Sequence, residues 1–205
     1  MCDNCENNYQ KLVSIDADAP RFDLPAYDPL KDEETGVVLE DLKWKWTVLF
    51  YYPADFTFVC PTELKDMMDS KSEFDELGVT VLAASTDTQF SHRAWVKNEK
   101  LMSGFPYLML ADHALWVAES YNVLDYKTWI AARGTFIIDP DLVCRWIEIT
   151  SWPLWRNSDE LIRKIKALQY MRAHPGTACP AKWVLWAKTL TPSMKISGEV
   201  ADALN

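Results

Sequence analysis

Two apolar runs separated by a helical pattern constrain the fold of this 205-residue chain more than any other feature. The runs Trp46–Tyr51 and Val79–Ser85 are rich in β-branched and aromatic residues, which is typical of buried strands. Apolar residues between Leu64 and Phe74 recur at spacings of three and four, which predicts a helix that ends near Gly78. This order predicts a parallel β-α-β unit at the centre of an α/β domain.

Cys60 lies at the junction between the first strand and this helix. Pro61 suits the first turn of a helix, where no backbone N–H is needed. A thiol at the positive end of a helix dipole loses its proton more easily, and the thiolate is the reactive form. We therefore interpret Cys60 as a nucleophile. The alternative is a structural cysteine, because free cysteines often serve as small core residues.

Three neighbours of Cys60 favour the nucleophile interpretation. Pro53 fixes the backbone where the strand ends, and Thr57 offers a hydroxyl three residues before the thiol. Glu63 enters the first helical turn, where a carboxylate is favourable and can orient neighbouring donors.

The segment 52–63 resembles the active-site motif of the typical two-cysteine peroxiredoxins, most closely the bacterial alkyl hydroperoxide reductase peroxidase subunit. Pro53, Thr57 and Cys60 match the family pattern P-x-x-x-T-x-x-C. The resemblance implies a thiol peroxidase in which Cys60 is the peroxidatic cysteine and Pro53, Thr57 and Glu63 are active-site residues.

Two later segments extend the resemblance. Arg133, in the segment 132–140, matches the family arginine that lies beside the peroxidatic thiolate, and a guanidinium keeps its charge and donates along a planar fork. Cys179, in the segment 174–183, resembles the resolving cysteine. In typical members this cysteine comes from the partner subunit, so the resemblance implies a homodimer, and the family's usual assembly is a decameric ring.

The resemblance also implies a mechanism. The Cys60 thiolate attacks a hydroperoxide held by Thr57, Arg133 and Pro53, and the resulting sulfenic acid condenses with Cys179 of the neighbouring subunit. The substrates would be hydrogen peroxide and organic hydroperoxides, and a thioredoxin-like or flavoprotein disulfide reductase would restore the dithiol. We expect no metal and no tightly bound cofactor.

The remaining patterns complete a thioredoxin-like α/β fold of the peroxiredoxin type, with a central mixed sheet flanked by helices and a C-terminal tail. Further elements are expected as a strand at 107–110, a helix at 114–121 capped by Asp112, and an antiparallel hairpin around the turn at 139–141. A long helix begins at 158–160 and runs to about His174. We expect a domain over residues 1–174 and a tail over 175–205 that carries Cys179.

Composition excludes several classes of function. The formal net charge of −9 argues against nucleic acid or an anionic membrane as the main partner. No apolar stretch is long enough to span a bilayer, and the first residues lack the pattern of a secretory signal. Five widely spread cysteines are unlike a secreted disulfide framework, so we expect a cytoplasmic protein with a reactive thiol.

Two cysteines near the N-terminus, Cys2 and Cys5, form a C-x-x-C pattern that could be a redox pair or half of a zinc site. A closed zinc site needs four ligands, and no second C-x-x-C or paired histidine follows. We interpret both as non-catalytic thiols of a loosely held tail. Cys144, in a predicted strand, is expected to be a structural core cysteine.

The chain departs from the family in its ten tryptophans. The family commonly has a glycine before an arginine at the position where this chain has Trp155 before Arg156. Four tryptophans lie in predicted loops or in the C-terminal tail: Trp129, Trp152, Trp155 and Trp186. Bulky aromatic residues there indicate an apolar interface or a pocket for larger hydroperoxides. Ordinary local packing is the alternative.

Two other functions fit the same fold class. A thioredoxin-type disulfide oxidoreductase needs a second thiol at the strand–helix turn, and Val59-Cys60-Pro61-Thr62 lacks it. A non-enzymatic scaffold or holdase would account for the aromatic surplus. Peroxide consumption in the presence of a reductant distinguishes a scaffold from an enzyme.

Overall fold

The computed structural model describes residues 12–151 and 153–204, and the chain divides into two compact units. The first unit ends at Arg156 and the second begins at Asn157. The proposed domain over 1–174 and tail over 175–205 stay predictions. Cys2, Cys5 and Trp152 lie outside the described residues.

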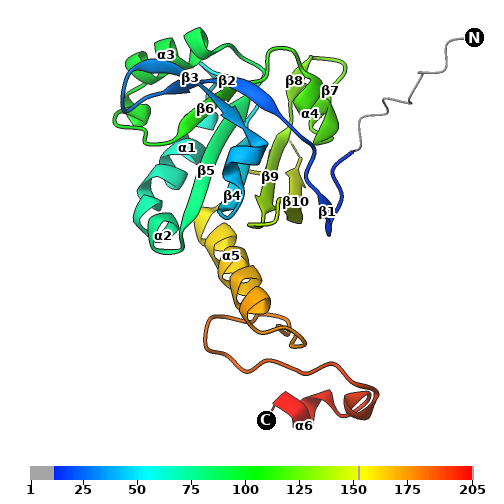
Figure 1. The fold of residues 1–205 in the computed structure, drawn as a ribbon. Coiled ribbons are helices and arrows are strands. Elements are labelled where there is room, and N and C mark those ends of the chain that lie inside the picture. The colour runs from blue at the N-terminus through cyan, green and yellow to red at the C-terminus, as the bar shows by residue number, and fades with distance from the viewer. Residues whose placement is uncertain (1–11, 152, 205) are drawn as a thin grey trace, which may run out of the picture. The chain divides into compact units, whose positions relative to one another are not determined.

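The first unit is built on one mixed sheet of eight strands (Figure 1). Its strand order is β1 (Ala17–Asp18), β10 (Val143–Thr150), β9 (Arg133–Ile138), β4 (Trp46–Tyr51), β5 (Val79–Ser85), β6 (Leu108–Ala111), β2 (Asp23–Asp28) and β3 (Glu33–Val38). The central strands β4, β5 and β6 are parallel, while β9 and β2 flank them in antiparallel register. A separate short hairpin pairs β7 (Leu124–Asp125) with β8 (Ile130–Ala131).

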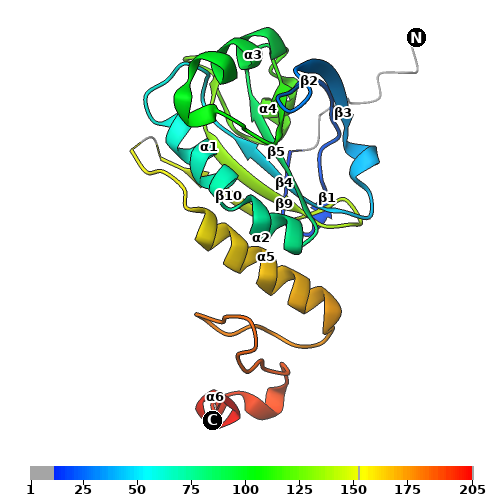
Figure 2. The same cartoon turned by 90° about the vertical axis from the view of Figure 1, so that its left-hand side faces the viewer.

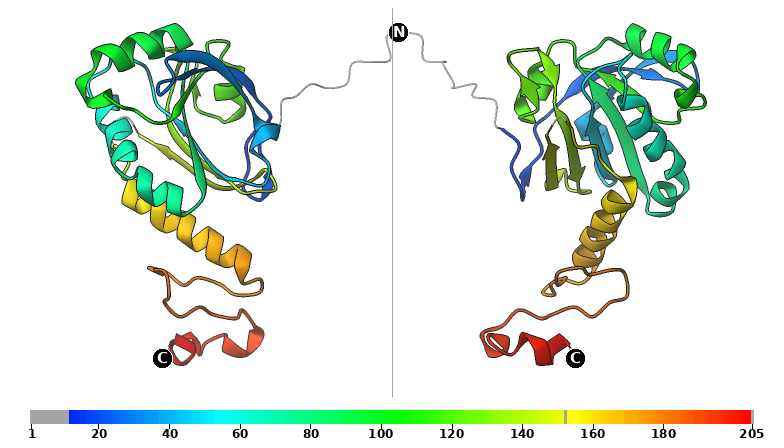
Figure 3. Two further views of the ribbon diagram at one scale, coloured as in Figure 1. Left: turned by 60° about the vertical axis from the view of Figure 1, so that its left-hand side comes forward. Right: turned by 180° about the vertical axis from the view of Figure 1, so that it is seen from behind.

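Helices cover both faces of this sheet. The crossover from β4 to β5 contains α1 (Cys60–Asp69) and α2 (Lys71–Glu76), and the crossover from β5 to β6 contains α3 (Gln89–Asn98). Parallel crossovers are right-handed, so these helices lie on one face; Figure 2 shows α1 and α2 following one another there. The short α4 (Trp116–Ser120) lies on the other side in the views of Figure 3. Single 3₁₀ turns occur at Leu39–Leu42 and Lys100–Met102.

The core follows the alternation of strand side chains. In β4, Leu49 and Tyr51 join the core cluster that includes Val117 and Tyr121 from α4. Their neighbours Val48 and Phe50 are also buried but point to the opposite face, as a period of two requires. A strand buried on both faces reads as a continuous apolar run, which is the pattern that the sequence shows.

The sequence predicted most of these elements correctly. The strands β4 and β5 have the predicted ends, and the β9–β10 pair is the predicted antiparallel hairpin. The carboxylate of Asp112 accepts hydrogen bonds from the backbone N–H groups of Val117 and Ala118, as a cap should, although α4 is shorter than predicted. The central mixed sheet with helices on its faces confirms the predicted α/β architecture.

One helix prediction was wrong in detail. The helix that begins at Cys60 does not continue unbroken towards Gly78, because Ser70 ends α1 with a backbone dihedral ψ of 9° before α2 starts. The backbone N–H of Ser70 donates to the carbonyls of Asp66 and Met68. The apolar spacing continues through this break, so periodicity alone could not reveal it.

The second unit consists of α5 (Ser158–Ala173) and the segment that follows it. The cap of α5 is Asn157, whose side chain accepts from the backbone N–H of Asp159, rather than the predicted Ser158. Past α5, Ala178 and Leu190 form an isolated antiparallel bridge, and the ring of Tyr170 lies 4.9 Å from that of Trp183. The predicted irregular segment also contains a 3₁₀ turn at Met194–Ile196 and α6 (Val200–Leu204).

Among the described residues, no helix combines the length and the apolar character that crossing a bilayer requires.

Candidate active site

Cys60 is the first residue of α1 and is only 1% exposed. Pro61 occupies the first turn, where its missing N–H breaks no helical hydrogen bond. The thiol therefore lies at the helix end that carries partial positive charge and is largely shielded from water. The sequence predicted this position.

Arg133 brings a positive charge into contact with this thiol. It is the first residue of β9, and β9 pairs with β4, the strand that leads to Cys60. Its Nη2 lies 3.7 Å from the Cys60 Sγ, and its Nε donates to Glu63 Oε2 at 3.0 Å. The Arg133–Glu63 ion pair is buried, with both side chains 2% exposed. The structure thus brings Cys60, Glu63 and Arg133 together from three predicted positions.

Glu63 also binds a second arginine, Arg156. The backbone N and the Nε of Arg156 donate to Glu63 Oε1 at 3.2 and 2.9 Å. The Nη1 of Arg156 donates to the carbonyls of Tyr51 and Gly134 at 2.8 and 3.0 Å, and its guanidinium lies 3.5 Å from the ring centroid of Phe50. One carboxylate therefore faces two guanidinium groups next to the thiol, so these three side chains together place a net positive charge beside the sulfur.

Arg156 is a residue of this cluster for which the sequence predicted no role. Burial lowers the pKa of Arg156, and the negative charge of Glu63 opposes that shift. Its buried Nη2 has no hydrogen-bond partner among the described residues. The sequence signal for Arg156 is the arginine that the family commonly carries at this position. Trp155 itself packs near Arg133, with 5.7 Å between its ring centroid and the Arg133 Cζ.

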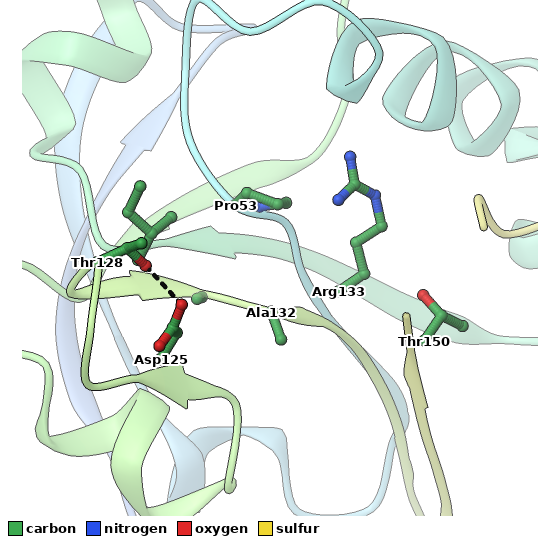
Figure 4. A pocket seen from close by; sticks show the side chains of 8 residues that line it. Pro53, Asp125, Thr128, Ala132, Arg133 and Thr150 are labelled. Carbon is green, nitrogen blue, oxygen red and sulfur yellow. Dashed lines mark hydrogen bonds between the residues drawn. The ribbon is translucent and has the colours of Figure 1, made fainter. Parts of the chain in front are cut away.

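The loop before Cys60 places the other predicted residues. Pro53 is buried, and the Thr57 hydroxyl donates to the carbonyl of Ala54 at 3.0 Å, so its lone pairs stay available as acceptors. Pro53 and Arg133 line the same cavity of about 360 Å³ (Figure 4). The role of Thr57 in binding the peroxide stays a prediction.

A buried polar network anchors this loop to α3. The carboxylate of Asp55 contacts the Nδ1 of His92 at 2.9 Å and accepts a hydrogen bond from the hydroxyl of Tyr52 at 2.7 Å. The other ring nitrogen of His92 lies 3.1 Å from the carbonyl oxygen of Leu110. Since a carbonyl only accepts, this nitrogen carries a proton. The network fixes the base of the loop five residues before the thiol.

The two other described cysteines lie in different environments. Cys144 is fully buried in the core cluster, and burial raises its pKa to about 11, as expected for a structural cysteine. Cys179 belongs to the second unit and is partly exposed. Burial raises the pKa of Cys179, while the charge of Arg163 opposes the shift.

The profile of the AhpC/TSA family matches residues 15–147 of this chain, which include Cys60, Glu63 and Arg133. Alkyl hydroperoxide reductase C of Staphylococcus epidermidis is 45% identical over 179 residues, covering 87% of this chain and 95% of that protein. The protein of the same name from Staphylococcus aureus is 46% identical over the same shares.

Solved structures show the same likeness. The reduced 2-Cys peroxiredoxin of Plasmodium vivax aligns with a TM-score of 0.86 at 27% identity, covering 91% of this chain and 98% of that one. Enterococcus faecalis AhpC aligns with a TM-score of 0.78 at 36% identity, covering 82% of this chain and all of that one. These structures confirm the predicted thioredoxin-like fold of the peroxiredoxin type.

Proposed function

The chain belongs to the AhpC/TSA family, and we propose that it reduces hydroperoxides with Cys60 as the attacking thiolate and Cys179 as the resolving thiol. It is a thiol-dependent peroxidase, an oxidoreductase. The observation that carries the residue assignment is the 3.7 Å contact between Arg133 Nη2 and Cys60 Sγ, with Arg133 held in place by Glu63.

In the first step the Cys60 thiolate attacks the terminal oxygen of the hydroperoxide. An S–O bond forms, the O–O bond breaks, and the leaving oxygen takes up a proton to give water or an alcohol, while the sulfur becomes a sulfenic acid. Negative charge moves from the sulfur to the leaving oxygen. Arg133 donates hydrogen bonds where this charge develops, and Pro53 and Thr57 complete the peroxide site.

Glu63 and Arg156 act through Arg133. Glu63 receives hydrogen bonds from both guanidinium groups, so it fixes the direction in which Arg133 points. Arg156 adds a second positive charge and ties Glu63 to the carbonyls of Tyr51 and Gly134. Holding the donors in place before the reaction avoids reorganisation during it.

In the second step the Cys179 sulfur attacks the Cys60 sulfenic acid. An S–S bond forms, and the oxygen leaves as water after protonation. The first turn of α1 must unwind, because Cys60 is buried at the start of a packed helix. A thioredoxin-like or flavoprotein disulfide reductase then reduces the disulfide.

The assembly and location follow the same family pattern. The chain forms a homodimer in which Cys179 serves the partner's Cys60, and the dimers form a decameric ring. The protein works in the cytoplasm, where a reducing environment keeps its thiols available for catalysis. Native mass spectrometry measures the subunit number directly.

A peroxide-consumption assay on three variants tests this function. Cys60→Ser abolishes turnover, whereas Cys179→Ser consumes about one peroxide per chain and then stops at the sulfenic acid. Cys144→Ala is the matched control and retains turnover. On non-reducing electrophoresis, one equivalent of peroxide gives a covalent dimer from wild type and none from Cys179→Ser. A Cys60→Ser protein that still turns over peroxide would disprove the assignment.

A further inference from the structure

The cavity beside Arg133 is larger than the reacting end of a peroxide requires. Its volume is about 360 Å³, and small-molecule sites typically span roughly 300–1,000 Å³. The residues that line it are Pro53, Asp125, Thr128, the segment 130–133 and Thr150. Hydrogen peroxide has no group that could fill this space.

We propose that this cavity binds the compact, uncharged organic group of a hydroperoxide and discriminates against hydroperoxides with a negative charge at the far end. The proposal rests on the proposed function, because it places the O–O group at Arg133 and Cys60. It assigns the organic group to a subsite and sets the substrate preference.

Arg133 connects the cavity with the reaction site. It is one of the residues that line the cavity, and its guanidinium contacts Cys60 and Glu63. Pro53, at the end of β4, lines the same cavity. Figure 4 shows the side chain of Pro53 between those of Thr128 and Arg133. A substrate oriented by Arg133 therefore has its organic group next to the cavity.

The lining suits an apolar group with few polar contacts. Ile130, Ala131 and Ala132 contribute apolar side chains. The hydroxyl of Thr150 is buried and has no hydrogen-bond partner among the described residues. Buried polar groups are normally satisfied, so a hydroxyl left free in a cavity wall is available to a ligand or to water.

One carboxylate, that of Asp125, lines the cavity. Asp125 accepts hydrogen bonds from the backbone N–H of Lys127 and from the hydroxyl of Thr128, both at 2.9 Å. These hydrogen bonds lower the pKa of Asp125, so its carboxylate is ionised at neutral pH. Figure 4 shows Asp125 and Thr128 at the end away from Arg133 and Thr150. A carboxylate on the distal end of a substrate would therefore face a like charge.

A cavity-filling variant tests the subsite. We expect Ala132→Leu to lower the ratio of kcat/KM for cumene hydroperoxide to kcat/KM for hydrogen peroxide by about tenfold or more, because the phenyl group loses its space. The matched control is Ala94→Leu, at an exposed position on α3, which leaves this ratio unchanged. An unchanged ratio in Ala132→Leu overturns the proposal.

A charge-removing variant tests the discrimination. Wild type should prefer cumene hydroperoxide to its para-carboxylate derivative, which has the same reacting group and a charged distal end. Asp125→Asn keeps a side-chain acceptor for the backbone N–H of Lys127 and removes the charge, so we expect this preference to shrink at least threefold. Asp41→Asn, at an exposed position, is the control. A preference that stays the same in Asp125→Asn overturns this part of the proposal.

A binding measurement tests the subsite independently of peroxidase turnover. The product alcohol 2-phenyl-2-propanol should bind Cys60→Ser protein in a calorimetric titration and should bind at least fivefold more weakly to the Cys60→Ser/Ala132→Leu double variant. Equal binding to both overturns the subsite even if peroxidase activity is intact. Binding that is lost only in the double variant supports the subsite, whether or not the wild type turns over peroxide. A wild type without turnover would refute the proposed function and not the subsite.

Discussion

Arg156 donates two hydrogen bonds, from its backbone N and its Nε, to the carboxylate of Glu63, which lies 93 positions earlier in the chain. The side chains are 5% and 2% exposed, so this ion pair is formed away from water. Glu63 binds Arg133 with its other oxygen. The position of the cation next to Cys60 thus depends on a carboxylate that is itself held by a second cation.

Glu63→Gln is expected to destabilise the fold by about 3 kcal/mol, since it leaves two buried guanidinium groups without their counter-charge. The rate of peroxide reduction should fall as well, because Arg133 loses the partner that directs it. Urea unfolding and stopped-flow kinetics measure the two effects. Glu76→Gln, at an exposed position of α2, is the control and should change neither. A Glu63→Gln protein as stable as wild type would show that the ion pair is dispensable.

Cys144 makes the stability of the fold depend on pH in the alkaline range. Burial raises the pKa of Cys144 from 9.0 to about 11 in the folded state. Between these values the folded state binds more protons than the unfolded state, so stability falls as pH rises from about 9 to about 11, by up to about 1.4 kcal/mol per pH unit.

Cys144→Ala removes this contribution. Denaturant unfolding between pH 8.5 and 11 should therefore show a smaller loss of stability in the variant than in wild type, and the comparison cancels the titration of other groups. Below pH 9, native wild type should not be alkylated at Cys144. Identical pH profiles for the two proteins, or rapid alkylation of native Cys144, would contradict the burial argument.

Trp44 adopts a left-handed backbone conformation with φ of 73° and is 74% exposed. This conformation costs a non-glycine residue about 1–2 kcal/mol, and the exposed ring recovers little by burial. Trp44→Gly keeps the backbone hydrogen bond to the carbonyl of Pro140. Glycine loses more conformational entropy on folding, which offsets part of the relieved strain. We therefore expect the free energy of unfolding to rise by about 0.5–1 kcal/mol.

Trp116→Gly is the matched comparison. Trp116 is the first residue of α4 and does not have a positive φ, so glycine there lowers helix propensity and stability. Thermal unfolding of both variants distinguishes backbone strain from a general effect of removing tryptophan. A destabilised Trp44→Gly protein would mean that the ring contributes more than the backbone strain costs.

The sequence predicts the fold well where apolar periodicity and local packing agree. The ends of β4 and β5 were predictable because both strands are continuous runs of mostly apolar, β-branched and aromatic residues. The break between α1 and α2 at Ser70 was not, since it changes the backbone without interrupting the apolar spacing. Asn157 rather than Ser158 caps α5, because neighbouring cap-forming residues compete and the chain path decides between them.

Some residues of the candidate site were predictable from the sequence and others were not. Cys60 was identifiable from local chemistry, and Arg133 from its family segment. The partnership of Arg156 with Glu63 and the cavity at Thr150 arise from chain pairing across β4, β9 and β10, which no local pattern encodes.

The central claim is that Arg133 beside Cys60 drives O–O cleavage, and one rate constant tests it. In a Cys179→Ser background, stopped-flow measurement gives the second-order rate constant for oxidation of Cys60 by hydrogen peroxide. We predict that Arg133→Lys lowers this constant by roughly 100-fold, because a lysine cannot keep both the Glu63 contact and the donor at the sulfur. Arg21→Lys, at an exposed position, is the control and leaves it unchanged. A rate constant within twofold of the Cys179→Ser parent in folded Arg133→Lys protein would contradict the account.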